Sequence, residues 1–119
     1  MNINKFTEKA QQGIIQAQEL ATQLNHSQIE PEHILLALVR QADGVVPQVL
    51  GKMGIAPQRV ERSLQSALER RARAYGAVQV GLSREAVDLL TRAEAEASTM
   101  RDEFVSTEHI LLAASEIKG

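Results

Sequence analysis

Two histidines in this sequence stand in equivalent surroundings, each directly after a glutamate: Glu32-His33 and Glu108-His109. Two zinc ligands on one helix need a four-residue spacing, whereas adjacent side chains point about 100° apart. The spacing therefore does not predict a metal site. The helix dipole favours a glutamate in the first turn, and a histidine there can hydrogen-bond nearby backbone, so we expect structural roles. His26 is expected to lie alone in a turn.

The sequence contains no recognisable set of side chains for catalysis. Gly51-Lys52 is the nearest approach to a phosphate-binding loop, but Val46 replaces its first glycine and Met53 replaces its serine or threonine. The absence of cysteine excludes thiolate metal sites, iron–sulfur clusters and a cysteine nucleophile. We therefore expect a non-catalytic domain with no metal and no cofactor of its own.

Composition argues against nucleic acid and membranes as partners. The net charge is −2, and the chain has one Tyr, two Phe and no Trp, so it offers neither a basic field nor stacking platforms for bases. The longest apolar run, at 34–39, is six residues, far short of the roughly 20 that span a bilayer. With no apolar leader in residues 1–13 and no cysteine, a cytoplasmic location is expected.

An internal duplication is the strongest pattern in the sequence. Residues 6–43 align without gaps to residues 82–119 at an offset of 76, and the run Glu-His-Ile-Leu-Leu-Ala at 32–37 recurs at 108–113. Thr7 and Ser83 fall in register as helix caps. Because similar sequences are expected to fold alike, the pattern predicts an all-α domain of two helical repeats related by a pseudo-twofold axis.

Apolar residues recur every three or four positions, which indicates helices rather than strands. Caps, prolines and glycines predict six helices at about 7–23, 31–41, 46–53, 57–73, 83–100 and 106–117. Residues 75–81 break the periodicity and are expected to form a linker with a short extended stretch. We divide the single domain, 1–119, into repeat one at 6–75, a linker at 76–81 and a truncated repeat two at 82–119. We expect a monomer whose shared core includes Leu35 and Leu111.

The opening Phe-Thr-Glu-Lys-Ala at 6–10 and the repeated Glu-His-Ile-Leu-Leu-Ala run resemble the Clp N-terminal repeat domain family, found at the front of ClpB, ClpC and ClpA ATPases. The resemblance covers essentially the whole chain. The run from Asp102 to His109 is most similar to the ClpB disaggregases, and ClpC is the alternative.

The resemblance implies a substrate-binding module without catalytic activity. In the ClpB case it would engage unfolded or aggregated polypeptide, and in the ClpC case it would engage adaptor proteins or arginine-phosphorylated clients. ATP and magnesium would bind in ATPase modules outside this chain, within a homohexameric parent protein.

The resemblance also implies which residues contact partners. Thr7, Asp102 and Glu108 match positions that carry functional weight in ClpB relatives. In the ClpC alternative, Glu32 and Glu108 match glutamates that help to hold phosphorylated arginine. A carboxylate can pair with the guanidinium but repels the phosphate, so hydroxyl or backbone N–H donors would be needed as well.

Relatives also use an apolar groove between the two helices of the second repeat. Leu90, Ala93 and Ala97 are the expected lining here, although the same three residues also suit the core stripe of a helix. Arg92 and His109 stand where some relatives have leucine, which predicts a smaller or more polar groove.

We predict that the chain neither binds nor hydrolyses ATP, because Gly51-Lys52 lacks the glycine and hydroxyl residues that hold phosphates and magnesium. Calorimetric titration with MgATP is expected to show no saturable heat. A stoichiometric site would contradict this prediction.

Overall fold

The computed structural model describes residues 2–76 and 79–117. Within them lie a 3-10 helix, six α-helices and two very short strands. Their bounds are Ile3–Lys5 (η1), Glu8–Gln23 (α1), Gln28–Ile29 (β1), Pro31–Val39 (α2), Val45–Lys52 (α3), Pro57–Glu69 (α4), Gly81–Leu82 (β2), Arg84–Thr99 (α5) and Thr107–Glu116 (α6). The predicted all-α fold is confirmed. Residues 77–78 of the predicted linker and residues 118–119 of the predicted second repeat lie outside the described residues.

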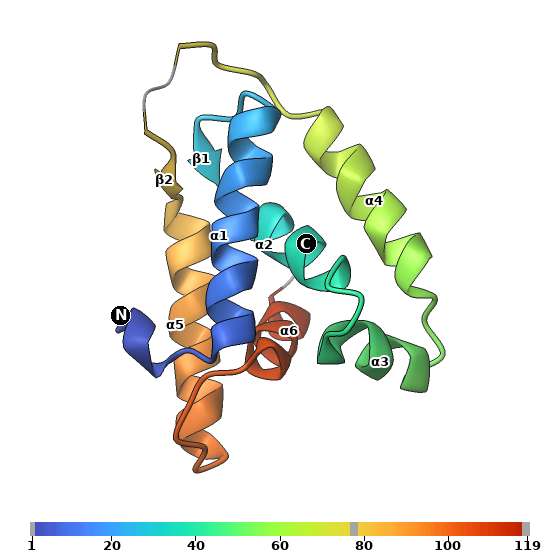
Figure 1. Ribbon diagram of the computed structural model, residues 1–119, viewed down its shortest axis with the longest axis vertical. Helices are drawn as coiled ribbons and strands as arrows, with labels where there is room; N and C mark the ends of the chain where they lie inside the picture. Colours follow the sequence, from blue (N-terminus) through green and yellow to red (C-terminus); the bar gives the residue numbers. More distant parts are fainter. Residues whose placement is uncertain (1, 77–78, 118–119) are drawn as a thin grey trace.

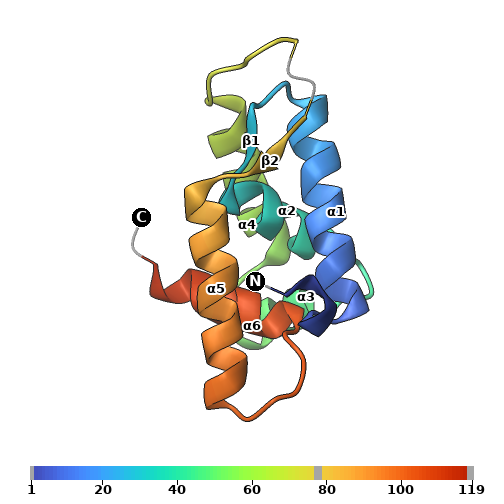
Figure 2. The same cartoon turned by 90° about the vertical axis from the view of Figure 1, so that its left-hand side faces the viewer.

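The helices are arranged around two central members. α1 and α5 are the two long helices and lie on the left in Figure 1. In the view of Figure 2, α2 lies between them and α6 crosses α5. α2 packs against α1 and α4, whereas α6 packs against α5 and α3. No helix among the described residues is long and apolar enough to cross a membrane.

The fourth helix is shorter than predicted. α4 ends at Glu69 rather than near residue 73, because the chain then turns back towards the end of α1. There the Ala74 N–H donates a hydrogen bond to the Asn25 carbonyl (2.7 Å), and the Arg73 guanidinium donates one to the Leu24 carbonyl (3.3 Å). Contacts distant in sequence therefore set this helix end, and periodicity within the helix could not reveal it.

Equivalent helix ends in the two halves have the same local structure. The Thr7 hydroxyl accepts a hydrogen bond from the Ala10 N–H at the start of α1, as the Ser83 hydroxyl does from the Ala86 N–H at the start of α5. Such caps satisfy N–H groups that have no partner inside the helix. Both predicted caps are confirmed.

Short extended segments join the two halves reciprocally. β1 pairs in parallel with β2, with Ile29 opposite Leu82, and an isolated bridge places Phe6 opposite Val105. The offset of 76 relates these two pairs to each other. The Ser83 N–H donates to the Ile29 carbonyl (3.0 Å), and the Thr7 N–H donates to the Val105 carbonyl (2.9 Å). Each half thus holds the cap of the other half's first helix.

The expectation that Leu35 belongs to the core is wrong, because this side chain is only half-buried. Leu111 is also half-buried, but it packs against the core. Their neighbours Ile34 and Ile110 are fully buried members of the core. When a helix has apolar residues on most sides, the sequence pattern alone does not show which side faces the core.

The leucines that follow break the symmetry between the halves. Leu36 on α2 is 0% exposed, whereas its equivalent Leu112 on α6 is 41% exposed. The difference arises because α4 packs over α2 (Figure 1), while no described element takes the corresponding place on α6.

We predict that Leu36→Ala lowers the free energy of unfolding by about 2–5 kcal/mol, since it leaves a cavity in a closed core. Leu112→Ala, the matched control on α6, is expected to cost less than about 1 kcal/mol because its side chain is already half in water. Urea denaturation followed by circular dichroism measures both. Equal losses for the two variants would contradict the asymmetry.

Candidate functional site

The amino-terminal ends of three helices meet at one depression. Thr7 before α1, Gly44 before α3 and Ser106 before α6 are the N-cap residues. The cavity between them has a volume of about 370 Å³. It is lined by Thr7, Glu8, Lys9, Asp43, Gly44, Val45, Ser106, Thr107 and Glu108. We call it the three-helix depression.

The structure brings Thr7 and Glu108 together there, although 100 residues separate them in the chain. Thr7 reaches this place because its N–H is bonded to the Val105 carbonyl, just before the start of α6. Helix N-termini carry partial positive charge and unpaired N–H groups, so the depression offers donors beside three exposed carboxylates, those of Glu8, Asp43 and Glu108.

An ion pair lies at the rim of the three-helix depression. Lys9 Nζ is 2.8 Å from Asp43 Oδ2, and both side chains are well exposed. The hydrogen bond from Lys9 lowers the pKa of the Asp43 carboxyl. Because exposed ion pairs contribute little to stability, this lysine can turn to an incoming anionic group at small cost.

Asp102 and His109 stabilise the amino-terminal end of α6, which is one of the three helix ends at the depression. His109 Nδ1 accepts from the Ser106 N–H (2.8 Å), which forms a capping box, and its Nε2 lies 2.8 Å from Asp102 Oδ2. His109 is buried. The structural role predicted for this histidine is confirmed, and both residues position the first turn of α6, where Glu108 lies.

The first repeat has a matching arrangement that sequence inspection missed. His33 Nδ1 accepts from the Glu30 N–H (2.8 Å), and His33 Nε2 lies 2.8 Å from His26 Nδ1. All three residues are buried. His26 is therefore buried and hydrogen-bonded rather than alone in a turn. The sequence signal that could have predicted this is the offset of 76, which aligns His26 with Asp102.

The buried histidine pair is held neutral. Burial lowers the pKa of His33 to about 4, with the neighbouring His26 and Arg71 adding to the effect. Burial also lowers the pKa of His26, an effect that Arg73 and Arg71 reinforce and that the Leu68 backbone and Glu30 oppose. Since His33 Nδ1 accepts a hydrogen bond from backbone, its proton is on Nε2 and is donated to His26.

The residues predicted to line a groove between the two helices of the second repeat do not line one. Leu90, Ala93 and Ala97 are buried, with Leu90 at 0% exposure, so none of them can meet a partner. They lie where α5 packs against α6, and the small alanine side chains favour close packing of the two helices. The sequence left two roles open for these residues, groove lining and core packing, and the structure shows core packing.

An apolar groove lies instead on the other side of α6. It has a volume of about 390 Å³ and runs between α6 and the α3 region. Its lining comprises Val49, Leu50, Met53, Ile55, Met100, Glu108, His109, Leu111, Leu112 and Ser115. We call it the α3–α6 groove. Glu108 is shared with the three-helix depression, so the two surfaces adjoin.

Glu32 lies at a different cavity from Glu108. That cavity, of about 460 Å³, is bounded by α2, α4, α5 and the end of α6, and includes Leu35, Leu89 and Arg92. The Arg71 guanidinium lies 3.8 Å from Glu32 and 3.5 Å from Glu30. The structure therefore does not bring Glu32 and Glu108 into one site, and Glu32 already has a cation beside it.

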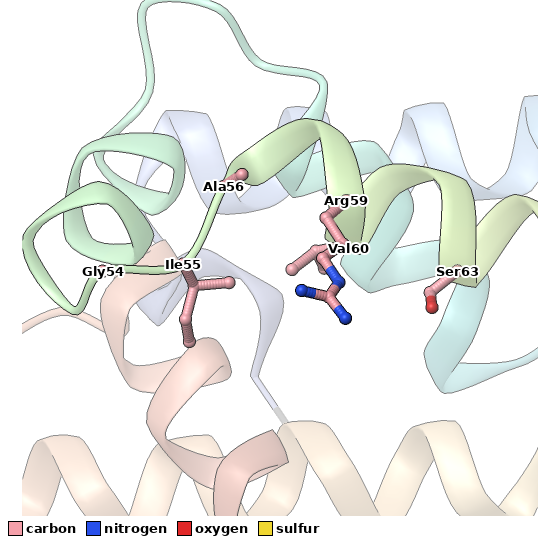
Figure 3. Close-up of a pocket in the computed structure, with 6 residues that line it drawn as sticks. All are labelled: Gly54, Ile55, Ala56, Arg59, Val60 and Ser63. Atoms are coloured by element: carbon pink, nitrogen blue, oxygen red, sulfur yellow. The ribbon is translucent and has the colours of Figure 1, made fainter.

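The largest of these cavities contains none of the predicted site residues. It has a volume of about 500 Å³ and lies at the turn between α3 and α4 (Figure 3). Arg59 is its one charged lining residue, beside Ile55, Val60 and Ser63. No cluster of metal-ligating side chains occurs in residues 2–76 and 79–117.

Comparison with known proteins identifies the family. Residues 5–119 match the family described as the Clp repeat (R) N-terminal domain. The chain belongs to this family. ClpB chaperones are among its curated relatives: that of Nitratidesulfovibrio vulgaris is 38% identical over 114 residues, covering 92% of this chain and 13% of the relative. The ClpB of Clostridium tetani is 37% identical over 116 residues, covering 94% of this chain and 13% of the relative.

Solved structures of the same kind superpose on the chain. The Hsp104 N-terminal domain of Candida albicans is 27% identical with a TM-score of 0.85, covering 94% of this chain and 74% of that one. The N-domain of ClpV from Vibrio cholerae is 25% identical with a TM-score of 0.83, covering 94% and 67%. A ClpV N-domain has also been solved in complex with a VipB peptide. The resemblance to ClpB N-terminal domains is thus confirmed.

We predict that acid destabilises the domain through its first repeat. The pKa of His33 is lower in the folded chain, about 4, than its ordinary value of 6.5. Between these values the unfolded state binds more protons, so stability is complete above pH 6.5 and falls as the pH drops towards 4. The loss amounts to roughly 3 kcal/mol. Urea denaturation at stepped pH measures it.

The variant His26→Asp is the matched control. It copies the Asp102–His109 pair into the first repeat, where a carboxylate would stabilise protonated His33. We expect a shallower decline in its stability between pH 6.5 and 4. Identical pH profiles for the variant and the parent chain would contradict the role given to the histidine pair.

Proposed function

We propose that the chain is the client-binding N-terminal module of a ClpB-type, ATP-dependent protein disaggregase in the cytoplasm. Its clients would be unfolded or aggregated polypeptides. The parent would be a homohexamer in which separate AAA+ modules bind ATP and magnesium, and this module would need no cofactor. The relatives named ClpB support this proposal, although the chain spans only 13% of the two compared above.

One observation carries the proposal: Thr7 and Glu108 line the same depression. The resemblance to ClpB relatives implies a functional role for both residues, and the fold brings them to the same surface. Around them, first-turn N–H groups can donate to the backbone carbonyls of an extended segment, since every unfolded client presents such carbonyls. Glu108 can pair with a basic side chain, and Val45, which is 40% exposed, offers apolar contact.

Binding at such a shallow surface is expected to be weak. Each contact is small, and an unfolded segment loses chain entropy when it docks. A ring that displays several copies of the module raises the effective concentration of sites without any new contact. Weak binding by one copy would also let clients dissociate and pass on to the ATPase modules of the parent protein.

A second candidate function is capture of arginine-phosphorylated clients, as in the ClpC alternative. The favouring observation is that Lys9 and the Thr107 hydroxyl lie in the same depression as Glu108. A guanidinium would pair with the glutamate while the phosphate met the lysine, the hydroxyl and the helix N-termini. Glu32 would not contribute, because it lies in another cavity beside Arg71.

We predict that Glu108→Gln weakens binding of a permanently unfolded, apolar-rich protein severalfold, since the carboxylate no longer pairs with basic side chains. Fluorescence anisotropy with the labelled client measures the dissociation constant. Glu103→Gln is the matched control, because Glu103 is also an exposed glutamate but lines neither the depression nor the groove. Its affinity is expected to equal that of the parent chain.

Two outcomes would redirect the proposal. Unchanged affinity of Glu108→Gln, with an intact helical signal, would remove the three-helix depression from client binding. Binding of free phosphoarginine to the parent chain but not to Glu108→Gln, with no binding of the unmodified client, would favour the ClpC alternative.

A further inference from the structure

An ion pair at the rim of the three-helix depression has its backbone fixed from the interior. Lys9, in the first turn of α1, pairs with Asp43, in the turn between α2 and α3 (2.8 Å). The buried side chain of Gln41 joins these two segments, because its Nε2 donates a hydrogen bond to the Lys9 carbonyl (3.0 Å). The two members of the ion pair therefore start from backbone positions that an interior hydrogen bond holds together.

The turn that carries Asp43 is tightly built. The Gly44 N–H donates to the Gln41 carbonyl (2.9 Å), which closes a four-residue turn with Asp43 at its third position. A Cβ atom at position 44 would lie 3.0 Å from Gln41 Cβ and 3.1 Å from the Gln41 carbonyl oxygen, closer than ordinary van der Waals contact. Glycine thus lets the turn pack on Gln41, and this packing keeps Asp43 within reach of Lys9.

The charges around the depression are close to balance. Glu8, Asp43 and Glu108 bring three carboxylates and Lys9 brings one ammonium group, so the lining residues carry a net formal charge of −2. The three helix ends add partial positive charge, roughly half an elementary charge each. They offset most of the negative charge but not all of it. In such a site, the gain or loss of one charged group decides which sign of ligand is favoured.

Asp43 controls this balance in two ways. It pairs with Lys9, the one cationic side chain among the described residues that line the depression. Its own carboxylate also repels an anionic ligand. Each effect is modest at an exposed position, but both act in the same direction. Without Asp43, a released lysine and three helix ends would face only two carboxylates, and the depression would favour anions.

We propose that Asp43 is the specificity-determining residue of the three-helix depression. By holding Lys9, it selects client segments in which arginine or lysine accompanies apolar residues, and it disfavours segments with anionic side chains, phosphorylated arginine included. The inference rests on the proposed function, in which the depression binds unfolded clients. It counts against the second candidate function in this chain, because a phosphate group would compete with Asp43 for Lys9.

Two short labelled peptides test this specificity. They share an apolar centre and differ only in their flanks, which are arginines in one peptide and glutamates in the other. Fluorescence anisotropy is expected to show that the parent chain binds the arginine peptide more tightly. Asp43→Asn is expected to lower this preference, measured as the ratio of the two affinities, about fivefold. The effect should shrink in about 1 M salt, because charges are then screened beyond roughly 3 Å.

Further variants show whether the effect depends on the position of the charge and on Lys9. Glu103→Gln changes the net charge equally but lies outside the depression, so it should leave the ratio unchanged. In a Lys9→Gln background, Asp43→Asn should strengthen binding of the glutamate peptide much less, because no lysine is released. All variants should keep the helical signal of the parent chain in circular dichroism, since both members of the ion pair are well exposed.

The outcomes separate this inference from the proposed function. If the arginine peptide binds and Asp43→Asn leaves the affinity ratio unchanged, the inference is overturned while the proposed function stands. An equal change of the ratio in Glu103→Gln would also overturn it, because net charge alone would then explain the effect. Tighter binding of the glutamate peptide by the parent chain would contradict it directly. If neither peptide binds the parent chain, the proposed function fails and the inference fails with it.

Discussion

The reciprocal backbone contact between the halves is the constraint on which the rest of the structure depends. Ser83 bonds to Ile29, and Thr7 bonds to Val105, so each first helix starts from a cap that the other half holds in place. Neither half can complete its own helix entry alone, because the paired residue lies 53 or 99 residues away in sequence. The same contact sets the start of α1 against the start of α6. The three-helix depression is therefore a product of how the duplicated halves join.

The two halves share their framework but differ in the groups that complete it. Each second helix begins with a histidine at its third position that accepts a hydrogen bond from the N-cap backbone. The partner of that histidine is His26 in the first half and Asp102 in the second. One half buries two neutral imidazoles, while the other joins an imidazole to a half-exposed carboxylate. In the first half, burial of both imidazoles lowers their pKa values, so protonation of His33 is expected to destabilise that half in acid.

Much of this could be predicted from the sequence, and the errors share a cause. The Thr7 and Ser83 caps, the six helices and the structural role of His33 and His109 follow from rules that act within one or two helical turns. The wrong predictions concern which side of a helix faces the core and which neighbouring element covers that side. Leu35 was expected in the core because it lies on an apolar stripe, but a stripe does not state which neighbour covers it. Leu90 was expected in a groove because relatives have one there, whereas its place on the apolar stripe of its helix correctly indicated the core. The early end of α4 likewise depends on Asn25, a residue far away in sequence.

The candidate site lies in only one half because the two halves differ in the residues around their equivalent glutamates, Glu32 and Glu108. Around Glu32, the equivalents of Ser106 and Thr107 are Glu30 and Pro31, which add a carboxylate and remove two hydroxyls. The extra carboxylate attracts Arg71 from the end of α4, and this guanidinium lies where a ligand's cation would otherwise pair. Around Glu108 the N-cap is a serine, and its neighbour Thr107 brings a hydroxyl. Substitutions at these two positions therefore leave Glu32 beside an internal cation and Glu108 at an open depression.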